Sequence, residues 1–526
     1  MATPASAPDE VTSASDPAPP QGAAAQACLL ALLVAWVPIA LFLADNAKAV
    51  IDVGPLLAFG AGLSLGCVGV VWAVGWRRGR PAARRAAGAC AVVVLSTFLY
   101  GRWLSTEPAS GVRGTIGVVL WLVLTALLAT LAARAMAVPA VRQFALITVA
   151  LVLVLATVTT GSVAVARRGA VALEAPTYAW PAPPERTPNI YWFVLDQYGR
   201  TDQLRAITGY DNASFEEALR QRGFAVSETT NAAYPHTHLS LASTLLMTYP
   251  WTDASTLAPD ANVRVYDEVG PVVRGDNPVV EALRDQGYSF IYAPAGVYDW
   301  GACDPTLADV CLTGADGAPW AADPLRALLA TTPFALVWGQ GAHQTPAGVL
   351  DQLDAERAQA AELEPFFVFA HILSPHEPIR YAPDCSLRSE WIQGSNLSGP
   401  ERVDAYVNDV RCLNADLVAA IDRIVAADPD AVIIVQSDHG SKLTFDWSKR
   451  YDAWTDANLQ ERFGALNAMR LPEGCDADVE GAPLVDTFPI VLGCLAGRAP
   501  EPGEQRSFFT DYGDLSTLVE VSDRVR

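Results

Sequence analysis

The stretch Ala431-Val-Ile-Ile-Val-Gln-Ser-Asp-His-Gly440 decides the fold of the second half of this 526-residue chain. It opens with five consecutive apolar residues, and so short and β-prone a run is typical of a strand buried in a parallel sheet. Asp438 and His439 follow almost at once, and both residue types can bind a metal. The stretch therefore predicts a buried strand that ends in chemically active side chains.

Similar runs occur upstream. Residues 190–195 end at Asp196, residues 366–369 end near His371, and a weaker run covers residues 289–292. Each is short, apolar and β-prone, so each is predicted to form a buried strand. Reactive residue types thus follow more than one strand.

The segment between the last two strong runs has helical periodicity. Apolar residues recur three or four apart over residues 406–424, which predicts one apolar helix face. Alternating strands and helices predict an α/β sandwich around a mostly parallel sheet, and such sheets bind ligands beyond the carboxyl ends of their strands. The candidate ligands at these ends are Asp196, His371, Asp438 and His439.

A fifth candidate is Thr237, in the stretch Asn231-Ala-Ala-Tyr-Pro-His-Thr-His-Leu-Ser-Leu-Ala-Ser243. Pro235 disfavours a helix before it, and residues 239–247 are predicted to be helical. Thr237 then lies at the positive end of that helix, which is a natural anion site. The ordinary alternative is that Thr237 only caps the helix.

Together these residue types permit metal-assisted attack by a hydroxyl on a phosphoryl group. A divalent cation lowers the pKa of a hydroxyl and polarises a phosphoryl oxygen, so a metal-bound threonine can act as a nucleophile. We expect Asp196, Asp438 and His439 to supply ligands for one divalent metal, Zn or Mn, with Thr237 as fourth ligand and nucleophile. His376 is predicted to bind the substrate phosphate or protonate the leaving group. Weaker candidates for substrate binding are His371 and Lys442.

The first part of the chain is a membrane domain by composition. Apolar residues make up 51% of the chain and its mean hydropathy is +0.22. Each of five apolar segments approaches the roughly 20 residues that cross a bilayer. They cover residues 26–44, 54–76, 87–104, 115–138 and 143–166, after a tail at 1–25 whose composition predicts disorder.

Arginines set the predicted orientation. Five of them lie in Trp76-Arg-Arg-Gly-Arg-Pro-Ala-Ala-Arg-Arg85, between the second and third segments, which marks that loop as cytoplasmic. The N-terminus is then inside and everything after the fifth segment outside, although Arg167 and Arg168 oppose this mildly. A Pro-rich stretch at 167–188 predicts a linker, and residues 189–526 then form the outer catalytic domain.

Charge and cysteine content agree with this division. Residues 176–526 hold 24 basic and 50 acidic residues, a net charge of −26, which disfavours binding to nucleic acid. Six cysteines in this part predict disulfides in an oxidising compartment, with buried free thiols as the alternative. Among about 15 possible pairings we favour neighbours: Cys303–Cys311, Cys385–Cys412 and Cys475–Cys494.

The motifs resemble the alkaline phosphatase and sulfatase superfamily over about residues 190–495. The resemblance is carried by the strands that begin at Asn189 and Val432, the helix that begins at Thr237, and the segment 367–381. Five apolar segments before such a domain look like lipoteichoic acid synthases and lipid A phosphoethanolamine transferases. Those families imply one metal held by Asp196, Thr237, Asp438 and His439.

Several positions depart from the family patterns. Sulfatases have a formylglycine precursor, Cys or Ser, where Thr237 stands, and a second Asp where Gln197 stands. Sulfate-ester cleavage is therefore disfavoured. The transferases usually have Glu at the position of Asp196. No His follows His439, so one metal is expected rather than two.

We therefore expect a membrane-anchored phosphotransferase that takes a phosphoryl unit from a phospholipid or another phosphoester donor. The acceptor would be a glycan or lipid of the cell envelope. The alternatives are a phosphodiesterase or sulfatase-like hydrolase with the same site, and a non-catalytic envelope scaffold. A transporter is less favoured, because the apolar segments have few charged residues at their centres.

Overall fold

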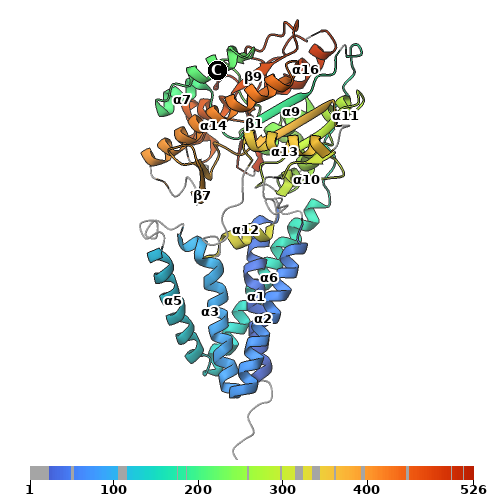
Figure 1. The fold of residues 1–526 in the computed structure, drawn as a ribbon. Helices are drawn as coiled ribbons and strands as arrows, with labels where there is room; N and C mark the ends of the chain where they lie inside the picture. The colour runs from blue at the N-terminus through green and yellow to red at the C-terminus, as the bar shows by residue number, and fades with distance from the viewer. Residues whose placement is uncertain are drawn as a thin grey trace, which may run out of the picture.

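The computed structural model describes most of the chain: residues 23–48, 52–104, 115–174, 176–184, 186–257, 260–296, 299–313, 324–333, 344–359, 363–392, 397, 399–445, 449–498, 500–512 and 514–526. The predicted tail, up to residue 22, lies outside these residues. Figure 1 shows a helical bundle formed by the first part of the chain and, beyond one end of it, an α/β domain.

Among the described residues, five helices are long and apolar enough to cross a membrane. They are α1 (Ala23–Asn46), α2 (Gly54–Arg78), α3 (Arg80–Leu104), α5 (Thr115–Ala135) and α6 (Pro139–Arg167). The arginine-rich stretch is mostly helical rather than a loop, because α2 ends at Arg78 and α3 begins at Arg80. Gly79 makes the break between them with a φ of 83°, which few other residues adopt.

The outer domain is built on a mostly parallel sheet, which confirms the predicted fold class. In spatial order its seven described strands are β2 (Ala225–Ser227), β9 (Asn467–Arg470), β8 (Val432–Ser437), β1 (Ile190–Leu195), β5 (Phe366–Ile372), β3 (Ser289–Ala293) and β4 (Val310–Cys311). The strands from β8 to β4 are parallel, whereas β9 is antiparallel to β8 and β2.

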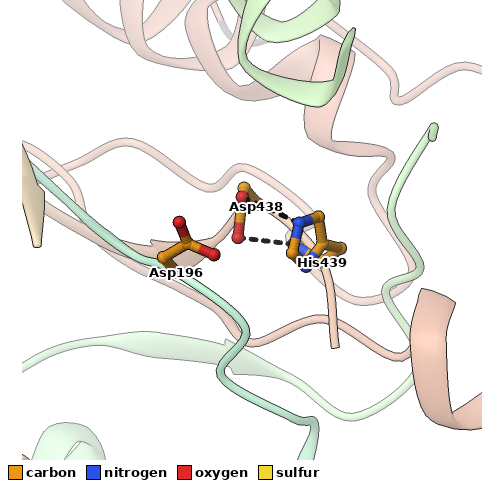
Figure 2. A group of neighbouring side chains, drawn as sticks. All are labelled: Asp196, Asp438 and His439. Atoms are coloured by element: carbon orange, nitrogen blue, oxygen red, sulfur yellow. Dashed lines mark hydrogen bonds and ion pairs between the residues drawn. The ribbon is translucent and has the colours of Figure 1, made fainter. Parts of the chain in front are cut away.

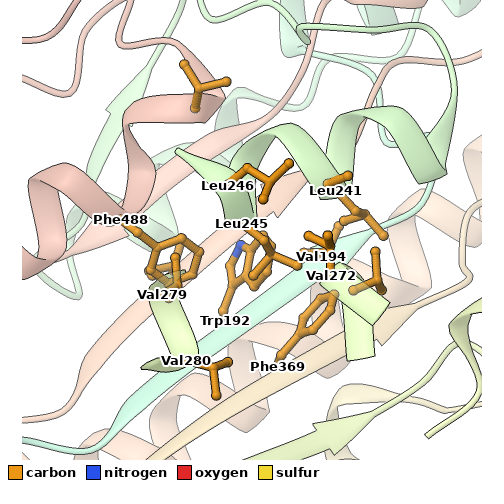
Figure 3. Packing of buried hydrophobic residues seen from close by; sticks show 14 of the residues in the cluster. Trp192, Val194, Leu241, Leu245, Leu246, Val272, Val279, Val280, Phe369 and Phe488 are labelled. Carbon is orange, nitrogen blue, oxygen red and sulfur yellow. The ribbon is translucent and has the colours of Figure 1, made fainter. Parts of the chain in front are cut away.

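Helices cover both faces of the sheet, which explains why β1 is apolar throughout. Ile190, Trp192 and Val194 face one core with α9 (Thr237–Leu246), α10 (Ala261–Arg274), α11 (Pro278–Arg284) and α16 (Thr487–Leu495). The alternate residues face a second core with α7 (Thr201–Thr208), α8 (Ala213–Arg220), α13 (Pro346–Gln359) and α14 (Gly399–Ala427). Figure 3 shows the first core, where the Trp192 ring stacks on Phe369 at 4.4 Å. Burial on both faces requires an unbroken apolar run.

Further described elements of the outer domain are α15 (Asp456–Phe463) and the hairpins β6–β7 (Ile379–Tyr381, Leu387–Ile392) and β10–β11 (Phe508–Asp511, Asp514–Glu520). Helix α12 (Pro324–Ala330) lies at the end of the membrane bundle (Figure 1). The three disulfides among the described residues are Cys303–Cys311, Cys385–Cys412 and Cys475–Cys494, as predicted.

The two parts of the chain are in direct contact. The Arg167 guanidinium, at the end of α6, makes a bidentate ion pair with Asp267 of α10, with N–O distances of 2.7 and 2.6 Å. In addition, Leu328 of α12 packs against Ile39 and Leu56 of the membrane helices. The Arg167 charge therefore has an outer-domain partner, which accounts for a basic residue at the outer end of the fifth membrane helix.

Part of the Pro-rich segment lies along the outer domain. Trp180 Nε1 donates to Ala282 O at 3.3 Å, and Tyr288 OH donates to Pro188 O at 2.8 Å. These contacts attach the segment to the domain surface. The domain limits drawn from the sequence stay predictions.

Candidate metal-centred active site

Strand register brings the predicted ligands together. β1 lies between β8 and β5, with Leu195 opposite Ser437 on one side and Val194 opposite His371 on the other. The residues after Leu195 and Ser437 are Asp196 and Asp438, so both carboxylates emerge at one edge of the sheet. Ligand atoms of Asp196, Asp438 and His439 all lie within 4.8 Å of one another (Figure 2).

Backbone N–H groups hold the Asp438 carboxylate. Its Oδ1 accepts from Gln197 N at 3.1 Å and from His439 N at 2.9 Å. Gln197 reaches this position with a φ of 64°, in the left-handed region that non-glycine residues seldom adopt. The backbone turns sharply after Asp196 in a conformation that costs free energy, and such strain is frequent at functional sites.

Thr237 faces the same centre. Helix α9 begins at Thr237 itself, two residues earlier than predicted, with His236 as its N-cap. The Thr237 hydroxyl lies 3.1 Å from His439 Nε2, and Ser240 Oγ, one turn further, donates to Asp438 O at 2.6 Å. The helix is thus attached to the segment that holds the ligands, with its positive end at the site.

The His439 imidazole is oriented as a ligand. Its Nδ1 lies 3.2 Å from the Gly440 carbonyl oxygen, which can only accept, so Nδ1 carries the proton and Nε2 presents a lone pair. Burial, together with the Arg462 charge, lowers the pKa of His439 well below its usual value. The ring is therefore neutral at neutral pH, as a metal ligand must be.

The donor set fits a cation. Asp438 Oδ2 lies 3.1 Å from His439 Nε2, so two electron-rich atoms face each other where a proton or metal ion would relieve their repulsion. Burial, and then the nearby Asp196 charge, raise the pKa of Asp438 well above its usual value. Oxygen and nitrogen donors of this kind have the chemistry of a divalent-metal centre.

The other predicted residues occupy the surroundings of Asp196. His371 is the penultimate residue of strand β5 rather than beyond its end, with Nε2 3.6 Å from Asp196 Oδ2. His376 donates its backbone N–H to Asp196 O at 3.0 Å. Burial lowers the pKa of both His376 and Lys442, and the positive charge of Lys442 lowers the pKa of His376 further. His376 is therefore mainly neutral at neutral pH.

Sequence reasoning missed the segment 460–465, at the end of α15. Glu461 is buried and accepts from Ser441 Oγ at 2.6 Å and from Leu443 N at 2.5 Å, which fixes the segment that carries Lys442. Arg462 is buried as well and donates Nη2 to His439 Nε2 at 3.0 Å. Neither residue belongs to a periodic pattern or follows a strand, so no sequence signal singled them out.

A cavity of about 490 Å³ lies elsewhere, beyond the amino-terminal ends of the parallel strands. Asn189 and Pro365, which line it, immediately precede β1 and β5. The proposed ligands follow the other ends of their strands. We therefore place the chemistry at the ligand cluster and not at this cavity.

Comparison with known proteins identifies the family. The sulfatase family model matches residues 188–460, more than half of the chain, so the chain belongs to the sulfatase family. It is therefore an enzyme of the sulfatase-like transferase or hydrolase type. A search of curated proteins gave no match.

Several solved structures are similar to the chain at low identity. The integral membrane protein lipooligosaccharide phosphoethanolamine transferase A of Neisseria meningitidis is 13% identical, with 90% of this chain and 95% of that chain covered and a TM-score of 0.43. The C-terminal periplasmic domain of EcEptC from Escherichia coli is 14% identical, with 66% and 96% covered and a TM-score of 0.41. The phosphonate monoester hydrolase of Agrobacterium radiobacter is 16% identical, with 61% and 80% covered and a TM-score of 0.38.

Proposed function

We propose that this chain is a membrane-anchored phosphotransferase that uses Thr237 as its nucleophile. The observation that carries the proposal is the Thr237 hydroxyl, 3.1 Å from His439 Nε2, beside the buried Asp196–Asp438–His439 cluster. Asp196, Asp438, His439 and Thr237 would hold one divalent ion, Zn or Mn. When bound, that ion would supply charge to lower the pKa of the hydroxyl and to polarise a phosphoryl oxygen.

The transfer takes two displacements. Thr237 Oγ1 loses its proton and forms a bond to phosphorus, while the bond from phosphorus to the diacylglycerol oxygen breaks. That oxygen takes a proton, and the result is a phosphothreonine diester. A hydroxyl of an envelope glycan or lipid then attacks phosphorus, its proton departs, and the Thr237 oxygen leaves and is reprotonated.

His376 and His371 have supporting parts in this proposal. His376 Nδ1 lies 2.5 Å from Glu377 O, a carbonyl oxygen that can only accept, so the single proton of the neutral ring is on Nδ1. His376 therefore donates from Nε2 to a phosphoryl oxygen or to the leaving group only in its minor protonated form. His371, near Asp196, orients that carboxylate. Lys442, whose loop is fixed by Glu461, supplies positive charge to the phosphate.

The membrane domain favours a lipid donor. Helix α6 ends at Arg167, which is paired with α10, and α10 packs against α9, the helix that begins with Thr237. A phospholipid head group at the membrane surface would thus lie on the side of the outer domain that is attached to the anchor. The arginine distribution and three disulfides support an N-terminus inside the cytoplasmic membrane and a catalytic domain outside it.

A mass measurement tests the nucleophile. Full-length protein is purified from its own membranes, and the peptide that contains Thr237 is analysed intact, alongside Thr237→Ala and Thr244→Ala. Thr244 is a matched control because it is buried on the same helix and donates only to Ser240 O, at 3.0 Å. We expect an adduct in wild type and in Thr244→Ala, and none in Thr237→Ala. A turnover assay with a Thr237→Ala variant as active as wild type would contradict the proposal.

The family match favours hydrolysis as the second candidate function. In that case water, and not an envelope hydroxyl, attacks phosphorus in the second step. Turnover of a phosphodiester with no acceptor present distinguishes the two. Rapid release of both products without acceptor indicates a hydrolase, whereas a single turnover that stops at the adduct indicates a transferase.

A further inference from the structure

The end of the membrane bundle away from the outer domain carries a concentrated positive charge (Figure 1). Among the described residues, the arginines at this end are Arg77, Arg78, Arg80, Arg84, Arg85, Arg134 and Arg142. The acidic residues of the described membrane domain lie near the other end of the helices: Asp45, Asp52 and Glu174. The arginines therefore have no carboxylate beside them within the described part of the bundle.

Two of these arginines line one pocket. Arg84 of α3 and Arg142 of α6 line it together with Gln26 of α1. The Nε atoms of both arginines are shielded from solvent and have no hydrogen-bond partner among the described residues. Arg142 is held in place by its Nη1, which donates to Met136 O at 2.8 Å and to Ala137 O at 3.0 Å. Donors that are buried and unpaired in this way favour an anionic acceptor.

Three helices begin around the pocket. Gln26 is the fourth residue of α1, Arg84 the fifth of α3 and Arg142 the fourth of α6. The positive ends of three helix dipoles therefore add to the charge of the two guanidinium groups. The pocket has a volume of about 10 Å³, which admits one atom of the size of a water oxygen. The group that enters it is thus a single anionic oxygen that belongs to a larger ligand.

The wall of the pocket indicates what that ligand is. Leu30 of α1, Ala87 of α3 and Leu146 of α6 also line it, each one turn deeper in the bundle than the polar residue of the same helix. Charge at the end of the bundle is thus followed by an apolar wall. A phospholipid has the same order, with an anionic phosphodiester above its acyl chains. Basic pockets between membrane helices bind lipid head groups by this combination.

We propose that Gln26, Arg84 and Arg142 form a binding site for the phosphate of an anionic phospholipid, in the leaflet away from the outer domain. With the orientation predicted from the sequence, this is the cytoplasmic leaflet. One phosphoryl oxygen accepts from the guanidinium groups, and the head group links α3 to α6, both of which pack on α1. The site lies at the opposite end of the bundle from the catalytic domain, so the inference does not depend on Thr237.

The test is native mass spectrometry of the full-length protein in a nonionic detergent, with phosphatidylglycerol and phosphatidylcholine of the same acyl chains as probes. Wild type should bind the anionic lipid more tightly than the zwitterionic one. Because hydrogen bonds to charged groups contribute roughly tenfold to a hundredfold in affinity, Arg84→Gln/Arg142→Gln should bind phosphatidylglycerol at least about tenfold more weakly.

A matched control separates this site from the general charge of the bundle. Arg78 and Arg85 lie at the same end and are exposed, so Arg78→Gln/Arg85→Gln removes the same charge without touching the pocket. Because exposed charges are screened by solvent and salt, we expect this variant to lose less than about threefold in affinity. An equal loss in both double variants overturns the proposal, since net charge alone would then attract the lipid.

Two other outcomes also overturn it. Displacement of phosphatidylglycerol by inorganic phosphate would show that the ligand is a free anion. Lipid binding that appears only after Asp9, Glu10 and Asp16 are neutralised would show that the acidic residues before α1 occupy the arginines instead. Should the double variant unfold, Arg84→Gln carries the test with Arg78→Gln as its control, since the bonds to the turn between α5 and α6 come from Arg142.

Discussion

Gly440→Ala is expected to inactivate the enzyme through a single methyl group. A Cβ at this position would lie 2.0 Å from Glu461 O and 2.8 Å from Gly464 O. Cβ atoms essentially never approach another heavy atom closer than 3.0 Å, so the turn after His439 or the segment 461–464 has to move by at least about 1 Å. Both contacts are to backbone oxygens, which cannot rotate away as a side chain can.

The displacement acts on the catalytic centre directly. Gly440 N donates to Arg462 O at 2.7 Å, and Gly440 O accepts from Arg462 and lies beside His439 Nδ1. A shift of about 1 Å in catalytic groups costs on the order of 100-fold in rate. Overpacking of this kind costs about 1–3 kcal/mol of stability. We therefore expect turnover to fall about 100-fold, metal content to fall, and the folded outer domain to survive.

The assay compares turnover of a phosphodiester, metal content by mass spectrometry and thermal unfolding in Gly440→Ala and Gly399→Ala. Gly399 begins α14, and a Cβ there would meet no heavy atom within 4 Å, so its substitution should leave all three quantities near wild type. Turnover in Gly440→Ala within threefold of wild type would refute the reasoning, because it would show that this turn does not position the site.

Three more predictions concern the metal, the core and the junction. Because the pKa of Asp438 is raised, a proton competes with the metal, so metal affinity should rise about tenfold per pH unit below that pKa and then level off; affinity independent of pH in a Zn titration would contradict this. Trp192→Phe removes the donor to Gln436 Oε1 at 2.8 Å and should lower the free energy of unfolding by about 1–3 kcal/mol, measured by chemical denaturation. Asp267→Asn should weaken the pairing with Arg167 by about 1.5–3 kcal/mol and speed tryptic cleavage after Arg168 in detergent, whereas an unchanged cleavage rate would mean that other contacts hold the junction.

The central sheet was predictable because it is buried on both faces. Strands β1, β5 and β8 are unbroken apolar runs, and reactive residues occur at or after their ends, so fold class and candidate ligands came from the same pattern. Pairing neighbouring cysteines also gave the disulfides found in the structure, since each pair closes a short segment of one domain. The buried strands, the candidate ligands and the disulfides all depend on side-chain type, which can be read directly from the sequence.

Strands β2 and β9, at one side of the sheet, were not predictable because their sequences lack such an apolar run. Strand β2 has three residues and β9 has four, and neither is long enough to show an alternating pattern. Asn467 in β9 is buried and polar because its side chain donates to Thr230 Oγ1 at 3.2 Å. A short strand with a polar buried residue looks like a loop in sequence.

The segment 460–465 shows why the site contains residues that no sequence motif predicted. Gly464 O accepts from Arg200 N at 3.1 Å and Ala465 N donates to Thr230 O at 3.2 Å, so this segment joins the chain after β1 to the chain before α9 through backbone groups. Every residue has such groups, and their use leaves no mark on the sequence. Glu461 and Arg462 act on the site through side chains, toward Ser441 and His439 respectively, whereas the Gln460 side chain donates away from it, to Arg526 O at 3.2 Å. Substitutions that preserve the backbone path should therefore be tolerated at Gln460, whereas Glu461 and Arg462 should not be replaceable without loss of the geometry around His439.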